Sequence, residues 1–195
     1  MIPPVTLGPG DHQRNGTVIM PTSLTVKGFV SLIENDLRSQ LCDVDIYILR
    51  HKAIKDVQYE TQLGNFTDLV NLGDGTNGQY DGSWVRSACP INTSTYTVIA
   101  HKKIRLEKAY GDANCVASGA NESVAAYNTS RHQRNFSIKI KMPKKLQYKN
   151  DTDITPSMDY PFMVIGWNVP TNLDTNSSIE SIRASASTHL YYKDG

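Results

Sequence analysis

Lysine and arginine are the residues whose type and spacing point most directly to chemistry in this sequence. In NFSIKIKMPKK, residues 135–145, Lys139 and Lys141 alternate with large apolar residues, and Lys144 and Lys145 follow directly. Successive side chains of a strand point to opposite faces, so this spacing predicts one apolar face and one row of positive charge. A row of ammonium groups is suited to bind phosphates, a contact that adds salt-dependent affinity but little sequence selectivity.

Other basic residues also gather on predicted strands, as Arg50 and Lys52 and as Lys102, Lys103 and Arg105. Two interpretations remain open for all of them. They form a surface that meets phosphates, or they are lysines on exposed edge strands that prevent sheets from joining edge to edge. The formal net charge is only +1, from 20 Lys and Arg against 19 Asp and Glu. A basic face is therefore expected only if the charges segregate.

Other motifs give no positive support for catalysis. LGDGTNGQ matches GxGxxG through Gly73, Gly75 and Gly78, but a dinucleotide site needs a strand before the motif and a helix after it. The sequence QYDGSW that follows predicts a loop, so a flexible turn is the better interpretation. The histidines are scattered without metal-ligand spacing, and GxSxG is absent. We therefore expect no enzyme activity, no metal and no cofactor.

Cysteines and glycosylation motifs bear on the compartment. Cys42, Cys89 and Cys115 are odd in number and widely spaced, which favours free thiols in a reducing environment. The opening residues do not resemble a secretory signal, and no apolar run is long enough to span a bilayer. Asn-x-Ser/Thr motifs begin at Asn15, Asn65, Asn92, Asn121, Asn128, Asn135, Asn150 and Asn176. Without a signal, a surface rich in Asn, Ser and Thr explains them.

The elements that must position these residues are strands. Period-two patterns of β-branched and aromatic residues cover residues 17–33, 44–53, 96–109, the first half of 135–150, 161–169 and 182–194. Pro21 marks a bend or an edge, and the nearly continuous apolar run 161–169 predicts a strand buried on both faces. The connections 55–94 and 110–134 are long, and Phe66, Leu69, Val70 and Leu72 have the spacing of one or two helical turns. A single all-β domain over residues 1–195 follows, as a sandwich of two antiparallel sheets.

Four stretches, in this order, resemble capsid proteins of circovirus-like viruses with circular single-stranded DNA. GPGDHQRNGTVIMPTSLTVKGFVSL, residues 8–32, is similar to the N-terminal strand signature of that family, with Gln13, Arg14, Gly16, Leu24, Val26 and Gly28 at its positions. TVIAHKKIRLEKA, NFSIKIKMPKKLQYKN and YPFMVIGWNV, with HLYYKD near the end, resemble later strands of the family. Together the stretches cover most of the chain.

The resemblance implies a single jelly roll, with two packed four-stranded antiparallel sheets and long inter-strand loops. It implies an icosahedral shell, commonly of sixty copies, around a circular single-stranded DNA genome, located in the virion and in the host nucleus during assembly. The Arg-rich N-terminal arm usual in the family is absent from MIPPVTLGPG. The expected nucleic-acid-binding residues are Arg14, Lys102, Lys103, Arg105, Lys139, Lys141, Lys144 and Lys145. Aromatic residues concentrate at interfaces, so Tyr80, Trp84 and Tyr127 in the long loops are expected at subunit contacts.

Three alternatives remain open. The first is the coat protein of a small RNA virus or satellite, which would share the fold. The second is a secreted, glycosylated β-sandwich that binds a sugar or a receptor. The third is a hydrolase whose site has no recognised motif. The basic residues also leave open an outward-facing surface that binds a sulfated cell-surface glycan.

Overall fold

The computed structural model describes residues 2–10, 13–32, 41–52, 68–79, 88–107, 133–142, 145–154, 156, 161–168 and 182–194. These residues form nine strands: β1 (Val18–Leu32), β2 (Leu41–His51), β3 (Val70–Asn71), β4 (Asn77–Gly78), β5 (Tyr96–Glu107), β6 (Gln133–Lys141), β7 (Leu146–Gln147), β8 (Phe162–Asn168) and β9 (Ile182–Asp194). All six strands predicted from period-two patterns are present. The prediction of an all-β chain is confirmed for the described residues.

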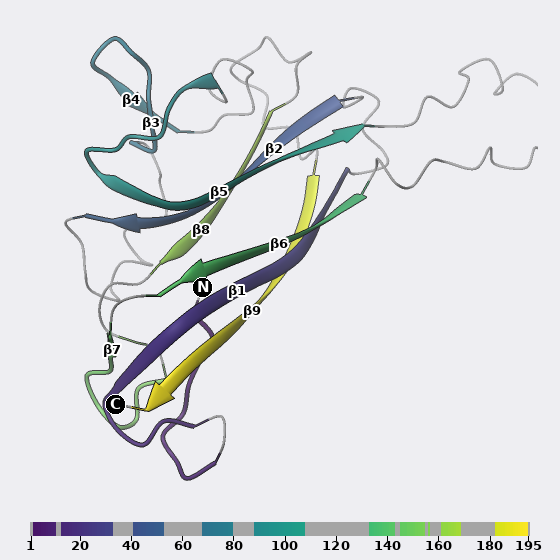
Figure 1. The fold of residues 1–195 in the computed structure, drawn as a ribbon. Coiled ribbons are helices and arrows are strands. Elements are labelled where there is room, and N and C mark those ends of the chain that lie inside the picture. Colours follow the sequence, from purple (N-terminus) through teal and green to yellow (C-terminus); the bar gives the residue numbers. More distant parts are fainter. Residues whose placement is uncertain are drawn as a thin grey trace, which may run out of the picture.

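Two antiparallel sheets form the layers of the fold (Figure 1). In the four-stranded sheet, β1 lies between β6 and β9, and the short β7 pairs with the beginning of β1. In the three-stranded sheet, β2 lies between β5 and β8. The described residues thus form one sheet of four strands, one of three and a two-stranded hairpin of β3 and β4, where two sheets of four were expected.

The core is built from alternate residues of the paired strands. Leu24 of β1 lies opposite Ile140 of β6 and Leu190 of β9, so the three side chains share one side of the sheet. They pack in the same cluster as Val44 and Ile46 of β2, which belong to the other sheet. Burying each aliphatic side chain contributes roughly 1.5–3 kcal/mol. On β6 the buried and exposed positions alternate from Phe136 onward, as the sequence predicts.

The three-stranded sheet is covered on its outer side as well at one end. Tyr47 and Leu49 of β2 lie in a second cluster with Leu69 and Val70, at the beginning of the β3–β4 hairpin. Every described residue of β8 is buried or half-buried, which agrees with the continuous apolar sequence of that strand. The hairpin therefore buries the second face of β2 and β8.

One local prediction was wrong and another is confirmed in the β3–β4 region. Leu69, Val70 and Leu72 do not form a helical turn, because Val70 and Asn71 pair with β4 instead, and Phe66 lies outside the described residues. Gly73 and Gly75 have φ values of 87° and 84°, a conformation that other residues rarely adopt. Two glycines of the GxGxxG motif thus make the tight turn between two strands, and the chain continues from them into β4 at Asn77 and Gly78.

Pro21 lies at an irregularity of the central strand β1, as its lack of an N–H group predicts. The pairing between β1 and β9 shifts register between Pro21 and Ser23, which leaves Thr22 as a bulge. On the other side of β1, β7 pairs only up to Ile19 and β6 pairs only from Ser23. Pro21 therefore lies at a break in both ladders, where a missing donor costs little.

We predict that Gly28→Ala destabilises the chain, because β1 is closely covered at this position. A Cβ on Gly28 would lie 2.2 Å from the carbonyl oxygen of Ser185 and 2.8 Å from Cζ of Phe136. Overpacking of this kind costs about 1–3 kcal/mol, which urea denaturation will detect as a lower midpoint. Gly16→Ala is the matched control, since a Cβ there meets nothing within 4 Å. Equal midpoints for the two variants would contradict the close packing of β9 on β1.

Candidate nucleic-acid interface

Strand pairing brings basic side chains of three strands to the outer side of the four-stranded sheet. Residues directly paired in an antiparallel sheet point to the same side. Thr25 of β1 is paired with Lys139 and His189, and Ser23 with Lys141 and Tyr191. These rows alternate with the buried rows of Leu24 and Val26, so they face away from the core.

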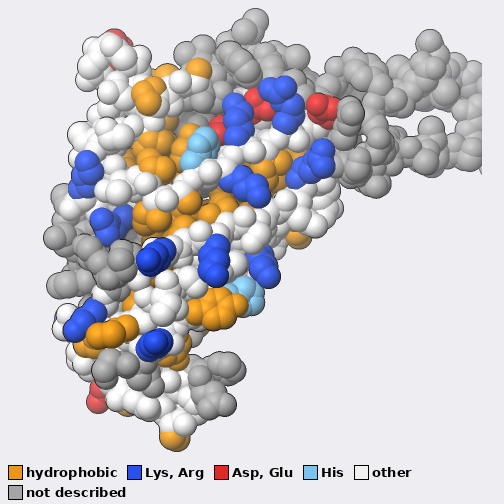
Figure 2. Space-filling model, viewed as in Figure 1, with side chains coloured by type: hydrophobic (Ala, Val, Ile, Leu, Met, Phe, Trp, Pro, Cys, Tyr) orange, Lys and Arg blue, Asp and Glu red, His pale blue; other side chains and the backbone are white. Residues whose placement is uncertain are grey.

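We call this surface the basic face, and it comprises Lys27, Lys139, Lys141, Arg183, His189 and Lys193, which are all exposed. Its strands β1, β6 and β9 contain a single acidic residue, Asp194, at the end of β9. Figure 2 shows basic side chains spread over this region without acidic side chains among them. Within the described residues, no ion pair involves the basic face. Its positive charge is therefore not neutralised by this part of the chain.

The basic residues of β5 have a different environment on the three-stranded sheet. Lys103 and Arg105 both bind the carboxylate of Asp43, which is buried on the neighbouring strand β2. Nε and Nη2 of Arg105 donate to the two oxygens of Asp43 at 2.8 and 3.2 Å, and Lys103 Nζ lies 3.2 Å from Oδ2. These contacts place the charges of both side chains against a carboxylate, so Lys103 and Arg105 are less suited than the basic face to bind phosphate.

A second carboxylate on β2 is paired in the same way. His101 Nε2 lies 2.8 Å from Oδ1 of Asp45, and the imidazole ring stacks on Tyr47 with ring centroids 4.2 Å apart. Asp45 is buried, while His101 is partly exposed. In Figure 2, acidic and basic side chains accordingly lie together near the ends of β2 and β5.

The contacts between Asp43 and the basic residues of β5 shift the pKa values of Asp43 and of Arg105. The hydrogen bond from Arg105, assisted by Lys103, holds the pKa of Asp43 below its ordinary value, although burial opposes this shift. The same contact raises the pKa of Arg105. Next along β2, burial among apolar residues and the charge of Asp43 raise the pKa of the Cys42 thiol to about 12. Cys42 is a free thiol and is un-ionised at neutral pH.

Arg14 does not occupy the position expected of a nucleic-acid-binding residue. Its side chain is fully buried. The guanidinium group lies over the ring of Tyr148, with Cζ 4.2 Å from the ring centroid. Nη2 donates to the carbonyl oxygens of Asn150, Asp151 and Asp153 at 2.9–3.0 Å, and Nη1 donates to that of Gly16. Arg14 thus fastens the turn after β7 to the N-terminal segment, and its guanidinium is not offered to a phosphate.

The remaining expected site residues are dispersed. Lys102 is half-buried in the same row as Ile46, whose side chain belongs to the core. Lys145 is exposed just before β7. Lys144 and the three aromatic residues expected at interfaces, Tyr80, Trp84 and Tyr127, lie outside the described residues. Of the expected basic set, Lys139 and Lys141 are the two that the structure brings onto the basic face.

Four members of the basic face were not singled out from the sequence. Lys27, Arg183, His189 and Lys193 lie on β1 and β9, whose period-two patterns contain them. Arg183 and His189 alternate with inward-facing residues along β9, and this local pattern could have predicted that both side chains face solvent. The pairing of β9 with β1 could not be predicted from a local pattern, because it joins residues that are roughly 160 positions apart in the chain.

Other sequence features have structural roles in the described residues. Asn92, the start of one glycosylation motif, is buried, and its side-chain amide donates to the carbonyl oxygen of Asp68 and to Thr95 Oγ1. This asparagine is therefore used inside the fold. The described residues contain no cluster of three or more potential metal ligands. No helix among them has the length and apolarity required to cross a membrane.

A scan of the chain against protein-family models finds no matching family, and a search of curated proteins finds no match.

We predict that Asp43→Asn reduces stability and removes part of its pH dependence. Because the pKa of Asp43 is lower in the folded state than its unfolded value of 3.8, its ion pairs contribute fully above about pH 5. Their contribution is lost as the pH falls through 3.8 towards the lower folded value. The variant should lose roughly 1–3 kcal/mol at neutral pH, and its stability should fall less steeply in acid.

The measurement is urea denaturation between about pH 2 and 7, the range over which carboxylates titrate. Asp151→Asn is the control, since that side chain is exposed. An acid limb as steep in Asp43→Asn as in the unaltered chain would show that the Asp43 ion pairs do not stabilise the fold.

Proposed function

We propose that this chain is a viral capsid subunit that assembles with copies of itself into an icosahedral shell enclosing a circular single-stranded DNA genome. The resemblance of its strand sequences to circovirus-like capsid proteins supports the proposal, and so does its two-layer antiparallel architecture. The observation on which it rests most heavily is the basic face. A sheet surface with exposed cations and no paired acids among the described residues is suited to lie against phosphates.

The pairing of the long strands supports the finer proposal of a jelly roll. β1 pairs with the last strand β9, and β2 pairs with β8, which precedes β9. Nested antiparallel pairs of this kind arise when a long two-stranded ribbon is rolled into two layers. The consecutive long strands β1 and β2, β5 and β6, and β8 and β9 each lie in different sheets, as such rolling requires.

The proposal gives the two sheets separate tasks. The four-stranded sheet would turn its basic face to the lumen and the genome. The three-stranded sheet, whose outer side has internally paired charges and a covering hairpin, would lie toward neighbouring subunits or the exterior. The balanced total charge then follows from segregation, since a protein with +1 net charge can still present a strongly basic surface.

We expect the purified chain to form uniform closed particles, roughly 20 nm across for sixty domains of this mass, in negative-stain microscopy. Nucleic acid extracted from particles made in cells is expected to be single-stranded DNA, degraded by DNase and resistant to RNase. RNA in the particles would favour the coat of an RNA virus. Hexose additions in the intact mass after eukaryotic expression would favour the secreted β-sandwich. A chain that stays monomeric at every concentration would contradict the capsid function.

We further expect charge reversal on the basic face, Lys139→Glu with Lys141→Glu, to lower the nucleic-acid content of particles while shells still form. The reason is that the substitution replaces phosphate-binding cations by anions without touching the core, since both side chains are exposed. The ratio of absorbance at 260 and 280 nm measures the content. Lys52→Glu with Lys149→Glu is the control with an equal change of charge, because both side chains are exposed and lie outside β1, β6 and β9. Unchanged content in the first double variant would refute the role given to the basic face.

A further inference from the structure

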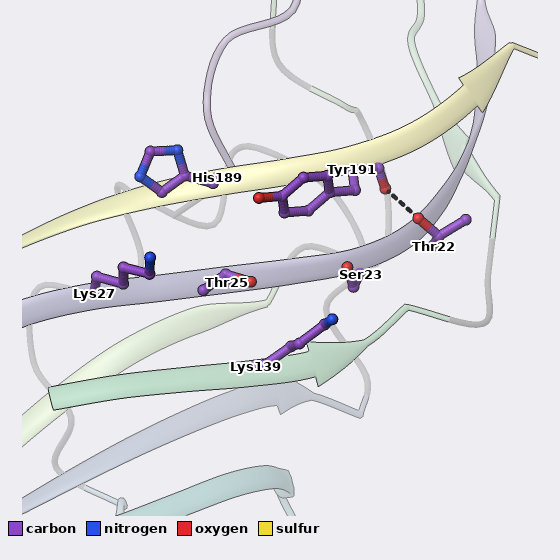
Figure 3. A pocket seen from close by; sticks show the side chains of 7 residues that line it. All are labelled: Thr22, Ser23, Thr25, Lys27, Lys139, His189 and Tyr191. Atoms are coloured by element: carbon purple, nitrogen blue, oxygen red, sulfur yellow. Dashed lines mark hydrogen bonds between the residues drawn. The ribbon is translucent and has the colours of Figure 1, made fainter.

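A hollow of about 390 Å³ lies at the centre of the basic face (Figure 3). Seven residues line it: Thr22, Ser23, Thr25, Lys27, Lys139, His189 and Tyr191. Its depth follows from the size of the side chains on the three strands. Ser23 and Thr25 on the central strand are short, whereas Lys139 on β6 and His189 and Tyr191 on β9 are long. The short side chains form a floor, and the long ones form walls about 10 Å apart, twice the spacing between strands.

The bulge in β1 helps to position one wall of the hollow. Thr22 is the extra residue of the bulge, and its hydroxyl donates to the carbonyl oxygen of Tyr191 at 3.0 Å. Bulges bend a strand and change the direction of nearby side chains. The Tyr191 side chain lies beside the hollow and is 58% exposed, the largest exposure among the large hydrophobic residues of the described chain. A largely exposed aromatic ring thus lies next to exposed lysines.

The groups around the hollow are cations, hydroxyls and one exposed aromatic ring, without an acidic residue among the lining residues. This combination matches a nucleotide, which has an anionic phosphate, a polar sugar and a flat base. We propose that the hollow holds one nucleotide of an unpaired strand. The base stacks on the ring of Tyr191, the phosphate lies against Lys27 and Lys139, and the hydroxyls of Ser23 and Thr25 face the sugar. The inference rests on the proposed function and assigns it a base-binding subsite.

The exposed ring is the reason to expect a single strand. Stacking on a protein side chain requires a base with a free face, which unpaired strands offer and a duplex hides. Stacking on an aromatic side chain also tolerates every base, as a site that meets a whole genome requires. Lysines alone would not distinguish single strands from duplexes or from sulfated glycans, because all of them present rows of anionic groups.

The test is fluorescence anisotropy of the purified full chain, held as free subunits below the concentration at which particles form, with a labelled oligothymidylate of about 12 nucleotides and with an abasic strand of equal length. Tyr191→Ala should weaken binding of oligothymidylate about tenfold and leave the dependence on salt unchanged. It should not affect the abasic strand, and Tyr191→Phe should bind like the unaltered chain. Lys139→Gln should lower the salt slope by about one for both strands.

Met20→Ala is the matched control, because Met20 is another exposed apolar side chain beside β9 but lies outside the hollow. It should leave the affinity for oligothymidylate unchanged. The proposal is overturned if Tyr191→Ala has no effect, or if it weakens the abasic strand or a heparin oligosaccharide as much as oligothymidylate. Those outcomes would leave shell formation and nucleic-acid packaging intact, so they would not bear on the capsid function itself. Absence of particles would instead refute that function.

Discussion

The hydrogen-bonded pairing of β1 with β6 on one edge and β9 on the other is the constraint on which the rest of the structure depends. Directly paired residues share one side of the sheet, so this register assigns every side chain of three strands to the core or to solvent. A slip by one residue would move Leu24 and Val26 out of the core and bring Lys139 into it. The apolar rows that hold the two sheets together therefore also hold the basic face in place.

The basic side chains of one sheet are paired with acids and those of the other sheet are not, and the difference arises from β2. β2 is covered on both sides, yet it contains Asp43 and Asp45, and a buried carboxylate is costly unless it is paired. Basic residues on β5 supply the partners, which leaves that surface nearly neutral. The strands of the other sheet bury no acid among their described side chains, so their lysines have no acidic partner within the part of the chain that the structure describes. The same residue types thus have structural roles on one sheet and are available to a ligand on the other.

Arg14 is a single residue whose role is decided by its surroundings, as it is for the basic residues of the two sheets. An arginine near the beginning of the chain was expected to bind nucleic acid, yet its Nη2 group donates to three carbonyl oxygens of the turn after β7, and Nη1 donates to that of Gly16. A guanidinium is always charged and can satisfy several oxygens in one plane, which suits it to fasten two loops. The residue type was compatible with either role, and the position of residues 150–153 in space selected one.

The sequence by itself determined where the long strands lie and which of their residues alternate, because period-two polarity is a local property of the chain. It located Lys139 and Lys141 on one face of β6, the glycine turn at Gly73 and Gly75, and the irregularity at Pro21. Only the tertiary structure decided which basic rows lie side by side, which are neutralised by buried aspartates, and where short side chains leave a hollow beside Tyr191. Those properties depend on pairing between strands far apart in the chain, and the energy that selects one pairing is the burial of two apolar sheet faces against each other.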